Sequence, residues 1–358
     1  MQKRIEKHRK IDHQSLWDFH PYWYHSDINI IYRLPFKYYF ANDAAEQKTT
    51  APQREQADIY IKMSHPEDHY TNELNRLLEN NSIEHYYSHD LIHFKDIGTG
   101  GFASVYVAKW NNTPTKYAVK KFVDNKEVYL TKMVNHHANI IGFYGVTKLE
   151  GEEMYSLILE YAEGRTLRDH LRNNIVKWNS QLRFAREIIS AIIWLHDYKS
   201  IVHGDLHPNN ILLHRDTIKL ADFGRSFEKG KGDNNTEVWG VVPYVDPKMY
   251  DKTILYKLNE KSDIYYLGVL FWKLASSSLL IDSPEDNYIT LRAAVPNTND
   301  KFTVLYQKCL KQEPDERPNI SEVNETLSSI DNDESTVSDS EESEYSYQID
   351  LNKNCQKL

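Results

Sequence analysis

The sequence predicts an α+β fold with two lobes: a small β-rich N-terminal lobe with one main helix, and a larger, mostly helical C-terminal lobe. Short apolar segments typical of strands occupy most of residues 91–161, whereas apolar residues recur at helical spacing after Thr166. Between these regions the segment Glu160–Gly164 interrupts both patterns and is a candidate hinge. At 358 residues the chain is long enough for one such two-lobed domain or for two small domains.

The composition narrows the class of protein. Hydrophobic residues make up 40% of the chain, which is enough for a buried core. The two cysteines, Cys309 and Cys355, do not suggest a disulfide framework, and this fits a reducing compartment. The N-terminal residues MQKRIEKHRK lack the apolar core of a secretory signal, and no apolar run approaches the roughly 18 residues of a membrane span. We therefore expect a cytoplasmic protein with no membrane span.

The formal net charge of −9 is unevenly distributed. Eight acidic residues and no Lys or Arg lie between Asp331 and Asp350, so the rest of the chain is close to neutral. Because there is no broad basic face, nucleic acid is not expected as a partner. The acidic, serine-rich tail (331–358) has too few apolar residues to fold alone, and we expect it to be disordered. It either solubilises the protein or acts as a phosphorylated or partner-docking segment.

Residues 1–90 are expected to form a partly ordered N-terminal extension. Aromatic residues crowd the segment Trp17–Phe40, which either packs as apolar cover on the main domain or offers a partner-binding surface. The polar stretch 41–58 has the composition of a linker. Ser64 and Glu67 have the spacing of a capping box, which predicts that a helix follows.

A glycine-rich turn is predicted between the first two strands of the small lobe. Leu91–Ile97 is a strand candidate, and Val105–Val107 alternates into a second one. Glycines in such a turn allow backbone N–H groups to approach phosphates closely. The motif alone is weak, because glycine-rich hairpin turns without a ligand are common. Its residues are Gly98, Thr99, Gly100 and Gly101.

A Lys–Glu pair is a second candidate for phosphate binding. Lys120 ends the strand candidate Tyr117–Lys120, and Glu127 lies in the helix candidate Asp124–Val134. A lone Lys and a lone Glu are usually solvated. An ion pair between strand and helix, however, would hold the ammonium on the phosphates of a nucleotide. The remaining strand candidates are Ile140–Val146 and Leu157–Tyr161.

The larger lobe is predicted to be helical up to about Ile330. Apolar residues in Gln181–Leu195 follow the period of an α-helix and form a buried stripe. A strongly apolar helix follows Ser262, which is its expected N-cap.

Three polar residues flank a predicted hairpin in the stretch VHGDLHPNNILLHRDTIKLADFG, residues 202–224. Asp205 and Asn210 precede its first apolar string, and Asp222 follows the second. A hairpin with a polar loop at each end brings the three side chains to one edge. Carboxylate and amide oxygens are hard ligands, suited to magnesium on phosphate. The stretch therefore predicts phosphoryl transfer.

These motifs, in this order, resemble those of the eukaryotic-type protein kinases, and most closely their tyrosine-kinase-like group. The glycine-rich turn, Lys120, the loop around Asp205 and the triplet that starts at Asp222 form the family's signature set. Asp263 would brace the backbone of the loop around Asp205, which is the family's catalytic loop, as a residue of the family's buried central helix does. The resemblance implies the two-lobed protein kinase fold over about residues 91–330, with an N-lobe at 91–159, a hinge at 160–164 and a C-lobe at 165–330.

The resemblance also implies the activity and the roles of the residues. The protein would transfer the γ-phosphoryl group of ATP to hydroxyls of protein substrates in signalling, with Ser/Thr favoured, and would use Mg²⁺. Asp205 would accept or orient the proton of the substrate hydroxyl. Asn210 and Asp222 would hold Mg²⁺. Lys120, held by Glu127, would bind the α- and β-phosphates.

The implied nucleotide site has an apolar part and a backbone part. The carbonyl of Glu160 and the backbone of Ala162 would bind the edge of the adenine. The apolar side chains on either side of the adenine would be those of Ile97, Val105, Ala118 and Leu212. The phosphates would be covered by the backbone of Gly98, Thr99, Gly100 and Gly101.

Several positions depart from the family's pattern. Gly204 replaces the Arg that normally meets an activation-loop phosphate, so we predict weak dependence on phosphorylation of that loop at Ser226 and Thr236. Lys248 replaces the Glu that pairs with the late Arg, here Arg317, so either another carboxylate serves this Arg or its site is more exposed. The other departures are Ala103, His207 and Val241.

Two alternatives to an active protein kinase remain. The departures allow a pseudokinase that acts as a nucleotide-binding scaffold, although none of them removes a metal ligand or the base. The motif His203-Gly-Asp205 is also similar to that of small-molecule phosphotransferases. The apolar helix after Ser262 and the segment Arg317-Pro318 argue against that second alternative.

Overall fold

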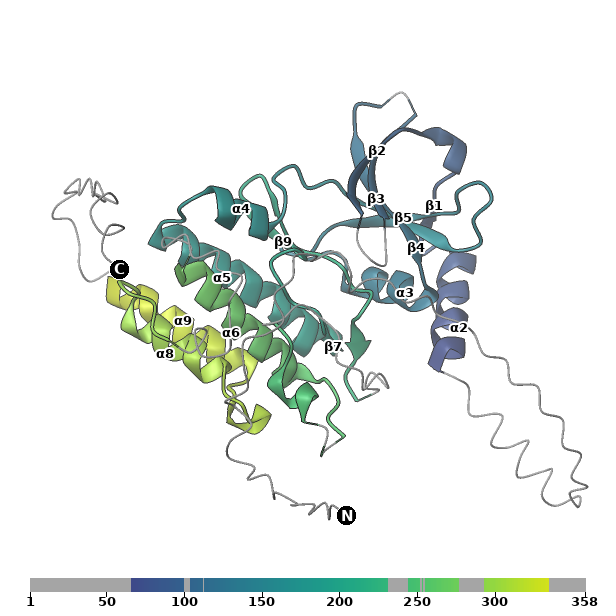
Figure 1. The fold of residues 1–358 in the computed structure, drawn as a ribbon. Coiled ribbons are helices and arrows are strands. Elements are labelled where there is room, and N and C mark those ends of the chain that lie inside the picture. The colour runs from purple at the N-terminus through teal and green to yellow at the C-terminus, as the bar shows by residue number, and fades with distance from the viewer. Residues whose placement is uncertain are drawn as a thin grey trace, which may run out of the picture. The chain divides into compact units, whose positions relative to one another are not determined.

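The structure is a computed structural model that describes residues 66–99, 104–111, 113–230, 244–251, 253, 255–276 and 293–334. In these residues a β-sheet lobe precedes a helical lobe, and the predicted two-lobed α+β fold is confirmed (Figure 1). The aromatic segment Trp17–Phe40, the linker and the tail beyond residue 334 lie outside the described residues.

The small lobe is built on a six-stranded sheet with the order β1-β5-β6-β4-β3-β2. Neighbouring strands are antiparallel except for β1 and β5, which run parallel. The strands are β1 (Glu84–His85), β2 (Leu91–Thr99), β3 (Ser104–Trp110), β4 (Lys116–Val123), β5 (Phe143–Thr147) and β6 (Tyr155–Glu160). Strand β5 starts later than predicted, because Ile140 and Ile141 pair with Leu220 of the other lobe instead of with the sheet.

Helix α3 (Asn125–Val134) packs against β5 and β6 and is the main helix of the small lobe. Asp124 caps it, since its side chain accepts the backbone N–H of Glu127 at 2.7 Å. The side chain of Val128 is fully buried and joins Phe143 and Leu157 in the core between helix and sheet. Burial of these apolar side chains fixes which face of α3 meets the sheet.

The packed lobe begins before Leu91, within the stretch that the sequence assigned to an N-terminal extension. Helix α2 (Pro66–Glu79) packs on α3, and β1 adds a strand to the sheet. A short 3₁₀ turn, η1 (Ser88–Asp90), leads from β1 into β2. Leu74 of α2 is 1% exposed and belongs to the same apolar core as Val128.

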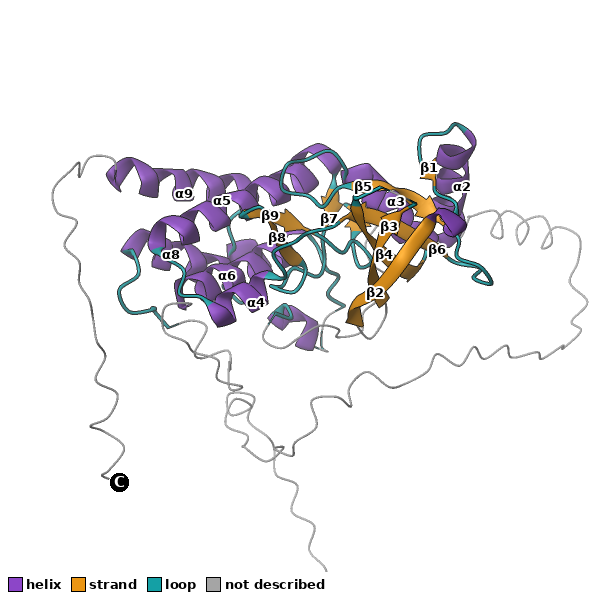
Figure 2. Ribbon diagram, turned by 90° about the horizontal axis from the view of Figure 1, so that it is seen from above, coloured by secondary structure: helices purple, strands orange, loops and turns teal. Residues whose placement is uncertain are grey.

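The larger lobe has a helical core in which α6 packs against α8, and α5 against α9. Figure 2 shows these helices gathered together, apart from the strands β2 to β6. The helices are α4 (Leu167–Asn173), α5 (Trp178–Ile193), the π-helical turn η2 (Trp194–Lys199), α6 (Glu260–Ser276), α8 (Asp300–Cys309) and α9 (Ile320–Glu334). Two 3₁₀ turns are η3 (Pro247–Tyr250) and η5 (Pro314–Glu316).

The N-terminus of α6 corrects one prediction. Ser262 lies inside the first turn of α6, so the prediction that it is the N-cap is wrong. Asn259 holds that position: its side chain accepts the N–H of Lys261 at 2.8 Å, and Ser262 Oγ in turn accepts the N–H of Asn259 at 3.3 Å. Asn and Ser are both good capping residues, and here they act as a reciprocal pair.

Two short antiparallel strand pairs follow α5. Strands β8 (Ile211–His214) and β9 (Thr217–Leu220) form the predicted hairpin, and β7 (Ile201–Val202) pairs with β10 (Phe227–Glu228). The hairpin lies between the two loops that carry the candidate catalytic residues. The β7–β10 pair joins the start of one of these loops to the end of the other.

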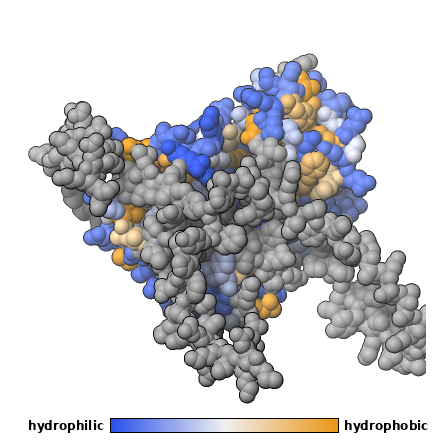
Figure 3. Space-filling view, in the orientation of Figure 1, coloured by the Kyte–Doolittle hydropathy of each residue, from blue (hydrophilic) through white to orange (hydrophobic). Residues whose placement is uncertain are grey.

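The described surface is mixed in polarity. On the small lobe, Figure 3 shows hydrophobic side chains scattered among hydrophilic ones. The large apolar side chains exposed there include Phe94, Ile97 and Phe122. Among the described residues, no helix combines the length and the apolar character that crossing a membrane requires.

Candidate active site

The ammonium group of Lys120 lies between two carboxylates where the lobes meet. Its Nζ is 2.6 Å from Oε1 of Glu127 and 2.9 Å from Oδ1 of Asp222. Lys120 comes from β4, Glu127 from α3 and Asp222 from the segment after β9. The structure thus brings together the Lys–Glu pair predicted from the sequence and adds Asp222 as a second partner.

These three charges shift each other's pKa values. Burial lowers the pKa of Lys120, but the charges of Asp222 and Glu127 outweigh burial and raise it. Burial raises the pKa of Glu127 to about 7, against the opposing charge of Lys120. Burial also raises the pKa of Asp222, but the charge and hydrogen bond of Lys120 and the N–H of Gly224 hold it below its usual value. Lys120 and Asp222 therefore remain an ion pair at neutral pH.

The β8–β9 hairpin holds Asn210 and Asp222 at one edge, as predicted. Ile211 pairs with Leu220, and the N–H of Ala221 donates to the carbonyl of Asn210 at 2.9 Å. Asp222 adopts φ +68, a left-handed conformation that turns the chain sharply before Phe223. Few residue types other than glycine tolerate this conformation, and Asp is among them.

Asp263 of α6 holds the catalytic-loop backbone. Its carboxylate accepts the N–H of His203 at 2.8 Å and the N–H of Gly204 at 2.9 Å. Nε2 of His196 lies 2.8 Å from the same carboxylate, which is fully buried. Charge-assisted hydrogen bonds of this kind fix the loop backbone firmly. The geometry matches the bracing role that the resemblance implies.

His203 connects the catalytic loop to the segment that carries Asp222. Its Nδ1 accepts the N–H of Asp205 at 3.3 Å, so Nε2 carries the proton and donates to the carbonyl of Ala221 at 3.2 Å. Burial lowers the pKa of His203, more than nearby carboxylates raise it, and keeps the ring neutral. Its ring also packs against that of Phe223.

The backbone conformation explains why glycine stands at position 204. Gly204 has φ +76, and a Cβ there would lie 2.9 Å from the carbonyl oxygen of Arg225. An Arg side chain is therefore disfavoured by both strain and space. Ser226 is fully buried, and its Oγ donates to the carbonyl of His203 at 3.0 Å. Thr236 lies outside the described residues, so weak dependence on activation-loop phosphorylation stays a prediction.

Asp205 is held beside Asn210 and His207. Nδ2 of Asn210 donates to the carbonyl of Asp205 at 2.9 Å, and Nε2 of His207 lies 3.6 Å from the Asp205 carboxylate. Burial raises the pKa of Asp205, but His207 and the charge of Arg225 outweigh burial and lower it. Asp205 is therefore an anion that can accept a hydrogen bond from a hydroxyl.

The site fits a magnesium ion that is shared with phosphate. The Asp222 side chain is 42% exposed, and Asn210 uses its amide nitrogen for Asp205, which leaves its amide oxygen as an acceptor. The described residues contain no cluster of three or more His, Cys, Asp or Glu side chains that could hold a metal. Mg²⁺ is usually held by one or two carboxylates together with substrate phosphates and water, and this donor set suits that arrangement.

The strands of the small lobe bring the predicted nucleotide-binding residues together. Val105 pairs with Lys120, and Ala118 pairs with Leu159. At the ends of β2 and β3, Gly98 pairs with Val105. Thr99 ends β2 at the same turn, whereas Gly100, Gly101 and Ala103 lie outside the described residues. Ile97 is 46% exposed on β2.

The hinge prediction is compatible with the chain's path after β6. The Glu160 carboxylate is engaged by Lys219 at 3.1 Å and by the N–H of Gly142 at 3.1 Å, and the Glu160 N–H donates to the carbonyl of Gly142 at 2.8 Å, so among these groups the predicted adenine contact falls to the Glu160 carbonyl. Ala162 and Leu212 are half-buried, and Leu212 bridges to Thr166 at the start of α4.

Arg317 binds Asp246 in place of the family's Glu, whose position holds Lys248 in this chain. Its guanidinium binds Asp246 with two parallel bonds of 2.7 and 2.8 Å, and both side chains are fully buried. Lys248, at the family's Glu position, instead pairs with Glu313 at 2.6 Å. The sequence left open whether another carboxylate serves Arg317 or its site is more exposed, and the structure shows that another carboxylate, Asp246, serves it. The signal was the acidic residue two positions before Lys248.

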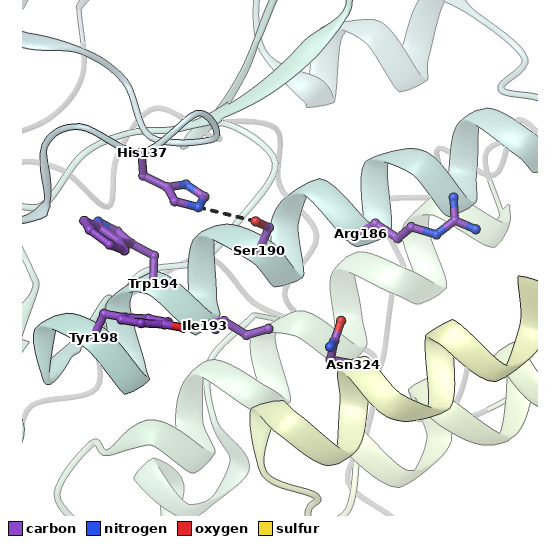
Figure 4. Close-up of a pocket in the computed structure, with 7 residues that line it drawn as sticks. All are labelled: His137, Arg186, Ser190, Ile193, Trp194, Tyr198 and Asn324. Carbon is purple, nitrogen blue, oxygen red and sulfur yellow. Dashed lines mark hydrogen bonds between the residues drawn. The ribbon is translucent and has the colours of Figure 1, made fainter.

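A cavity of about 460 Å³ lies away from these residues, between α5, η2 and α9 (Figure 4). Nε2 of His137 lies 3.3 Å from Oγ of Ser190 within it. Its lining residues are His137, Arg186, Ser190, Ile193, Trp194, Tyr198 and Asn324. They include no carboxylate, so a magnesium-bound nucleotide is better accommodated at Lys120 and Asp222 than in this cavity.

Comparison with known proteins places these features in a family. A family model described as protein kinase domain matches residues 91–327. The LEAF RUST 10 disease-resistance locus receptor-like protein kinase-like 1.4 of Arabidopsis thaliana is 30% identical over 67% of this chain and 42% of its own length. A probable serine/threonine-protein kinase of Dictyostelium discoideum is 28% identical over 69% of this chain and 15% of its own length.

A third relative, the U-box domain-containing protein 33 of Arabidopsis thaliana, is 36% identical over 50% of this chain and 22% of its own length. The chain thus spans less than half the length of these curated relatives. The family model covers well over half of the chain, in the part that holds the Lys120, Asp205 and Asp222 site. The chain belongs to the protein kinase domain family.

Proposed function

We propose that the chain is an ATP- and Mg²⁺-dependent protein kinase that phosphorylates Ser and Thr hydroxyls of proteins. The main observation is the Lys120 ammonium held between Glu127 and Asp222, at 2.6 and 2.9 Å. This arrangement needs both lobes in the relative position that phosphoryl transfer requires. The alignment of β4, α3 and the β8–β9 hairpin supplies that position.

The chemistry asks the protein for positioning and charge neutralisation. Asp205, kept ionised by His207 and Arg225, orients the substrate hydroxyl and takes its proton. The hydroxyl oxygen forms the new bond to the γ-phosphorus as the bond from that phosphorus to the β–γ bridging oxygen breaks, and ADP leaves. Lys120 binds the α- and β-phosphates and offsets their charge. Asn210 holds the Asp205 backbone in place.

Magnesium would be held by Asp222 and by the amide oxygen of Asn210, together with the phosphates. When bound, it neutralises charge that develops on the transferred group. The chain's own contribution is to keep Asp222 ionised and turned by its left-handed backbone toward that place.

The preference for Ser and Thr, the location and the partners are supported less directly. Names of relatives such as the Dictyostelium discoideum protein support Ser/Thr specificity. Scarce cysteine and the lack of an apolar run in the sequence support a cytoplasmic location. We propose that the aromatic segment Trp17–Phe40 or the acidic tail (331–358) binds partner proteins.

Transfer of labelled phosphate tests the proposal. The full chain is incubated with γ-labelled ATP, Mg²⁺ and a generic protein substrate, and the product is analysed for phosphoserine, phosphothreonine and phosphotyrosine. Asp205→Asn and Lys120→Met should each abolish transfer, while the exposed Asp197→Asn serves as the matched control. Binding of ATP without any transfer would establish a pseudokinase. Transfer to aminoglycosides or choline alone would establish a small-molecule phosphotransferase.

A further inference from the structure

Helix α2 (Pro66–Glu79) precedes the part of the chain that the kinase family model matches, yet it packs on α3, which carries Glu127. Leu74 of α2 is 1% exposed and shares an apolar cluster with Val128 of α3. The ring of Tyr70 lies 5.6 Å from that of Tyr129. The two helices therefore bury apolar side chains against each other along their length.

Helix α3 is fixed to its surroundings at both ends by different elements. At its C-terminal end, the carbonyl of Val134 accepts the indole N–H of Trp194 at 2.8 Å, and Asn135 bonds both backbone groups of Phe143. At its N-terminal end, Nδ2 of Asn125 donates to Oγ1 of Thr71 on α2 at 3.0 Å. Glu127 lies in the first turn, so α2 holds the end of α3 that positions the carboxylate for Lys120.

Helix α2 also reaches the strand that follows the Asp222 segment. Oη of Tyr70 lies 3.5 Å from Oε2 of Glu228, and Nε2 of His69 lies 3.9 Å from the same oxygen. Glu228 belongs to β10, which pairs with β7 immediately before the catalytic loop. Tyr70 is 6% exposed, so its ring is buried between α3 and this contact. Burial and the charge of Glu228 raise the pKa of Tyr70 to about 12, and the phenol stays protonated as a donor.

We propose that α2 is a positioning element for phosphoryl transfer, and that Tyr70 is its central residue, coupling the N-terminal end of α3 to strand β10. The proposal rests on the proposed kinase function. If the contacts between α2 and α3 are lost, the N-terminal end of α3 can move away from the sheet while its C-terminal end stays fixed. The Glu127 carboxylate then leaves Lys120, and the ammonium loses its place on the phosphates. Small shifts of a packed helix can switch a site between two arrangements in this way.

A mere stabilising role for α2 makes a different prediction. Burial of Leu74 and Tyr70 stabilises the fold whatever Glu127 does, so loss of the Tyr70 ring would lower the melting temperature alone. A positioning role acts through the Lys120–Glu127 pair. Its effect on activity must therefore disappear when that pair is already broken, while its effect on stability persists.

A double-mutant cycle on the full chain separates the two roles. We expect Tyr70→Ala to lower kcat/KM for ATP at least 10-fold in the otherwise unchanged chain, and less than 2-fold in a Glu127→Gln background. Its effect on the melting temperature should be similar in both. Tyr70→Phe keeps the ring packing on α3 and removes only the 3.5 Å contact to Glu228, so it should keep part of the activity, and the remaining loss measures the coupling to β10. Asn75→Ala, exposed on the same helix, is the matched control.

Two further measurements keep the test decisive. If Tyr70→Ala does not fold, Tyr70→Leu preserves apolar burial and takes its place. Hydrogen exchange over α3 and β10 does not require transfer, so it tests the positioning role even if the chain proves to be a pseudokinase. Faster exchange at both elements in the Tyr70 variant supports the proposal. Equal losses of activity in the two backgrounds, or unchanged exchange at α3, would overturn it.

Discussion

Two clusters in this protein each pair a buried cation with carboxylates, but they differ in net charge and in exposure to solvent. In one, Arg317 and Asp246 form a pair in which both side chains are fully buried. In the other, Lys120 lies between Glu127 and Asp222, and the Asp222 side chain is 42% exposed. The first cluster is neutral as a unit. The second combines one ammonium with two carboxyl groups: Glu127, whose pKa is raised to about 7, and Asp222, which is ionised and partly open to solvent.

The two clusters also differ in how completely their hydrogen-bonding groups are paired. The five N–H groups of Arg317 all have acceptors: two oxygens of Asp246 and the backbone carbonyls of three residues, Lys261, Lys311 and Gln312. A saturated, neutral pair has nothing to offer a ligand, and its role is to hold the segment around Asp246 against η5. The Lys120 cluster gains an excess negative charge as Glu127 ionises near pH 7, and a cation can balance it. Saturation therefore distinguishes the Arg317 pair, and surplus charge distinguishes the cluster at the proposed active site.

Breaking the saturated pair should have the largest effect on stability. Asp246→Asn leaves a buried guanidinium without its counter-charge, and a loss of this kind costs about 3–5 kcal/mol. Chemical denaturation should show this loss at constant m-value. Asp246→Ala combined with Lys248→Glu tests whether a carboxylate at the family's usual position can serve Arg317. Recovery of less than a quarter of the loss would show that the backbone here is adapted to Asp246 alone.

Neutralising the open anion should instead affect activity. Asp222→Asn keeps the shape of the side chain but removes the charge that balances Lys120 and a metal ion. We expect kcat/KM to fall by about 10²–10³-fold, as when one preorganised electrostatic group is removed from an active site. The melting temperature should change much less than in Asp246→Asn. A stability loss as large as that of Asp246→Asn would show that the two clusters are not different in kind.

The sequence placed the residues of the candidate site more completely than the partner of Arg317, and distance along the chain explains why, since only the Lys120–Asp222 contact spans a long separation of 102 positions. Asp205, Asn210 and Asp222 lie within one short stretch whose hairpin pattern brings them together. Lys120 and Glu127 are separated by seven residues. Such local spacings constrain geometry strongly, so the motif and the fold class were both accessible.

The parts that the sequence did not reveal depend on long-range packing. Asp246 and Arg317 are 71 residues apart, and Tyr70 and Glu228 are 158 apart. No local periodicity connects either pair, so the packing of α2 on α3 could not be derived, and Asp246 could be only a candidate partner of Arg317 through its place two positions before Lys248. The wrong N-cap prediction at Ser262 has another cause. Asn259 and Ser262 have similar capping tendencies, and only the observed start of α6 at Glu260 shows that Asn259 is the cap.

The raised pKa of Glu127 should make the stability of the Lys120 cluster depend on pH. Its pKa is raised to about 7 from 4.5, so the folded protein binds a proton more tightly than the unfolded chain between these values. This group alone therefore makes the ligand-free protein less stable as pH rises from about 5 to 7. Glu127→Gln should become more stable relative to wild type over that range, by on the order of 1–3 kcal/mol.

Melting temperatures of both proteins at several pH values measure this difference. The Asp246–Arg317 pair lies far along the chain and should contribute the same to each protein. A difference between wild type and Glu127→Gln that stays flat from pH 5 to 8 would contradict the raised pKa. A difference of opposite sign would mean that Lys120 stabilises the carboxylate more than burial penalises it.

The smallest effect is expected at the ion pair two residues from Asp246. Lys248 contacts Glu313 at 2.6 Å, closer than Arg317 contacts Asp246, but the Glu313 side chain is 52% exposed. Solvent screens such pairs, and their coupling is usually about 0–1 kcal/mol and falls with added salt. A double-mutant cycle with Lys248→Ala and Glu313→Ala should give a coupling in this range. A coupling near that of the Asp246–Arg317 pair would mean that short contact distance, and not burial, determines the strength of the ion pairs in this segment.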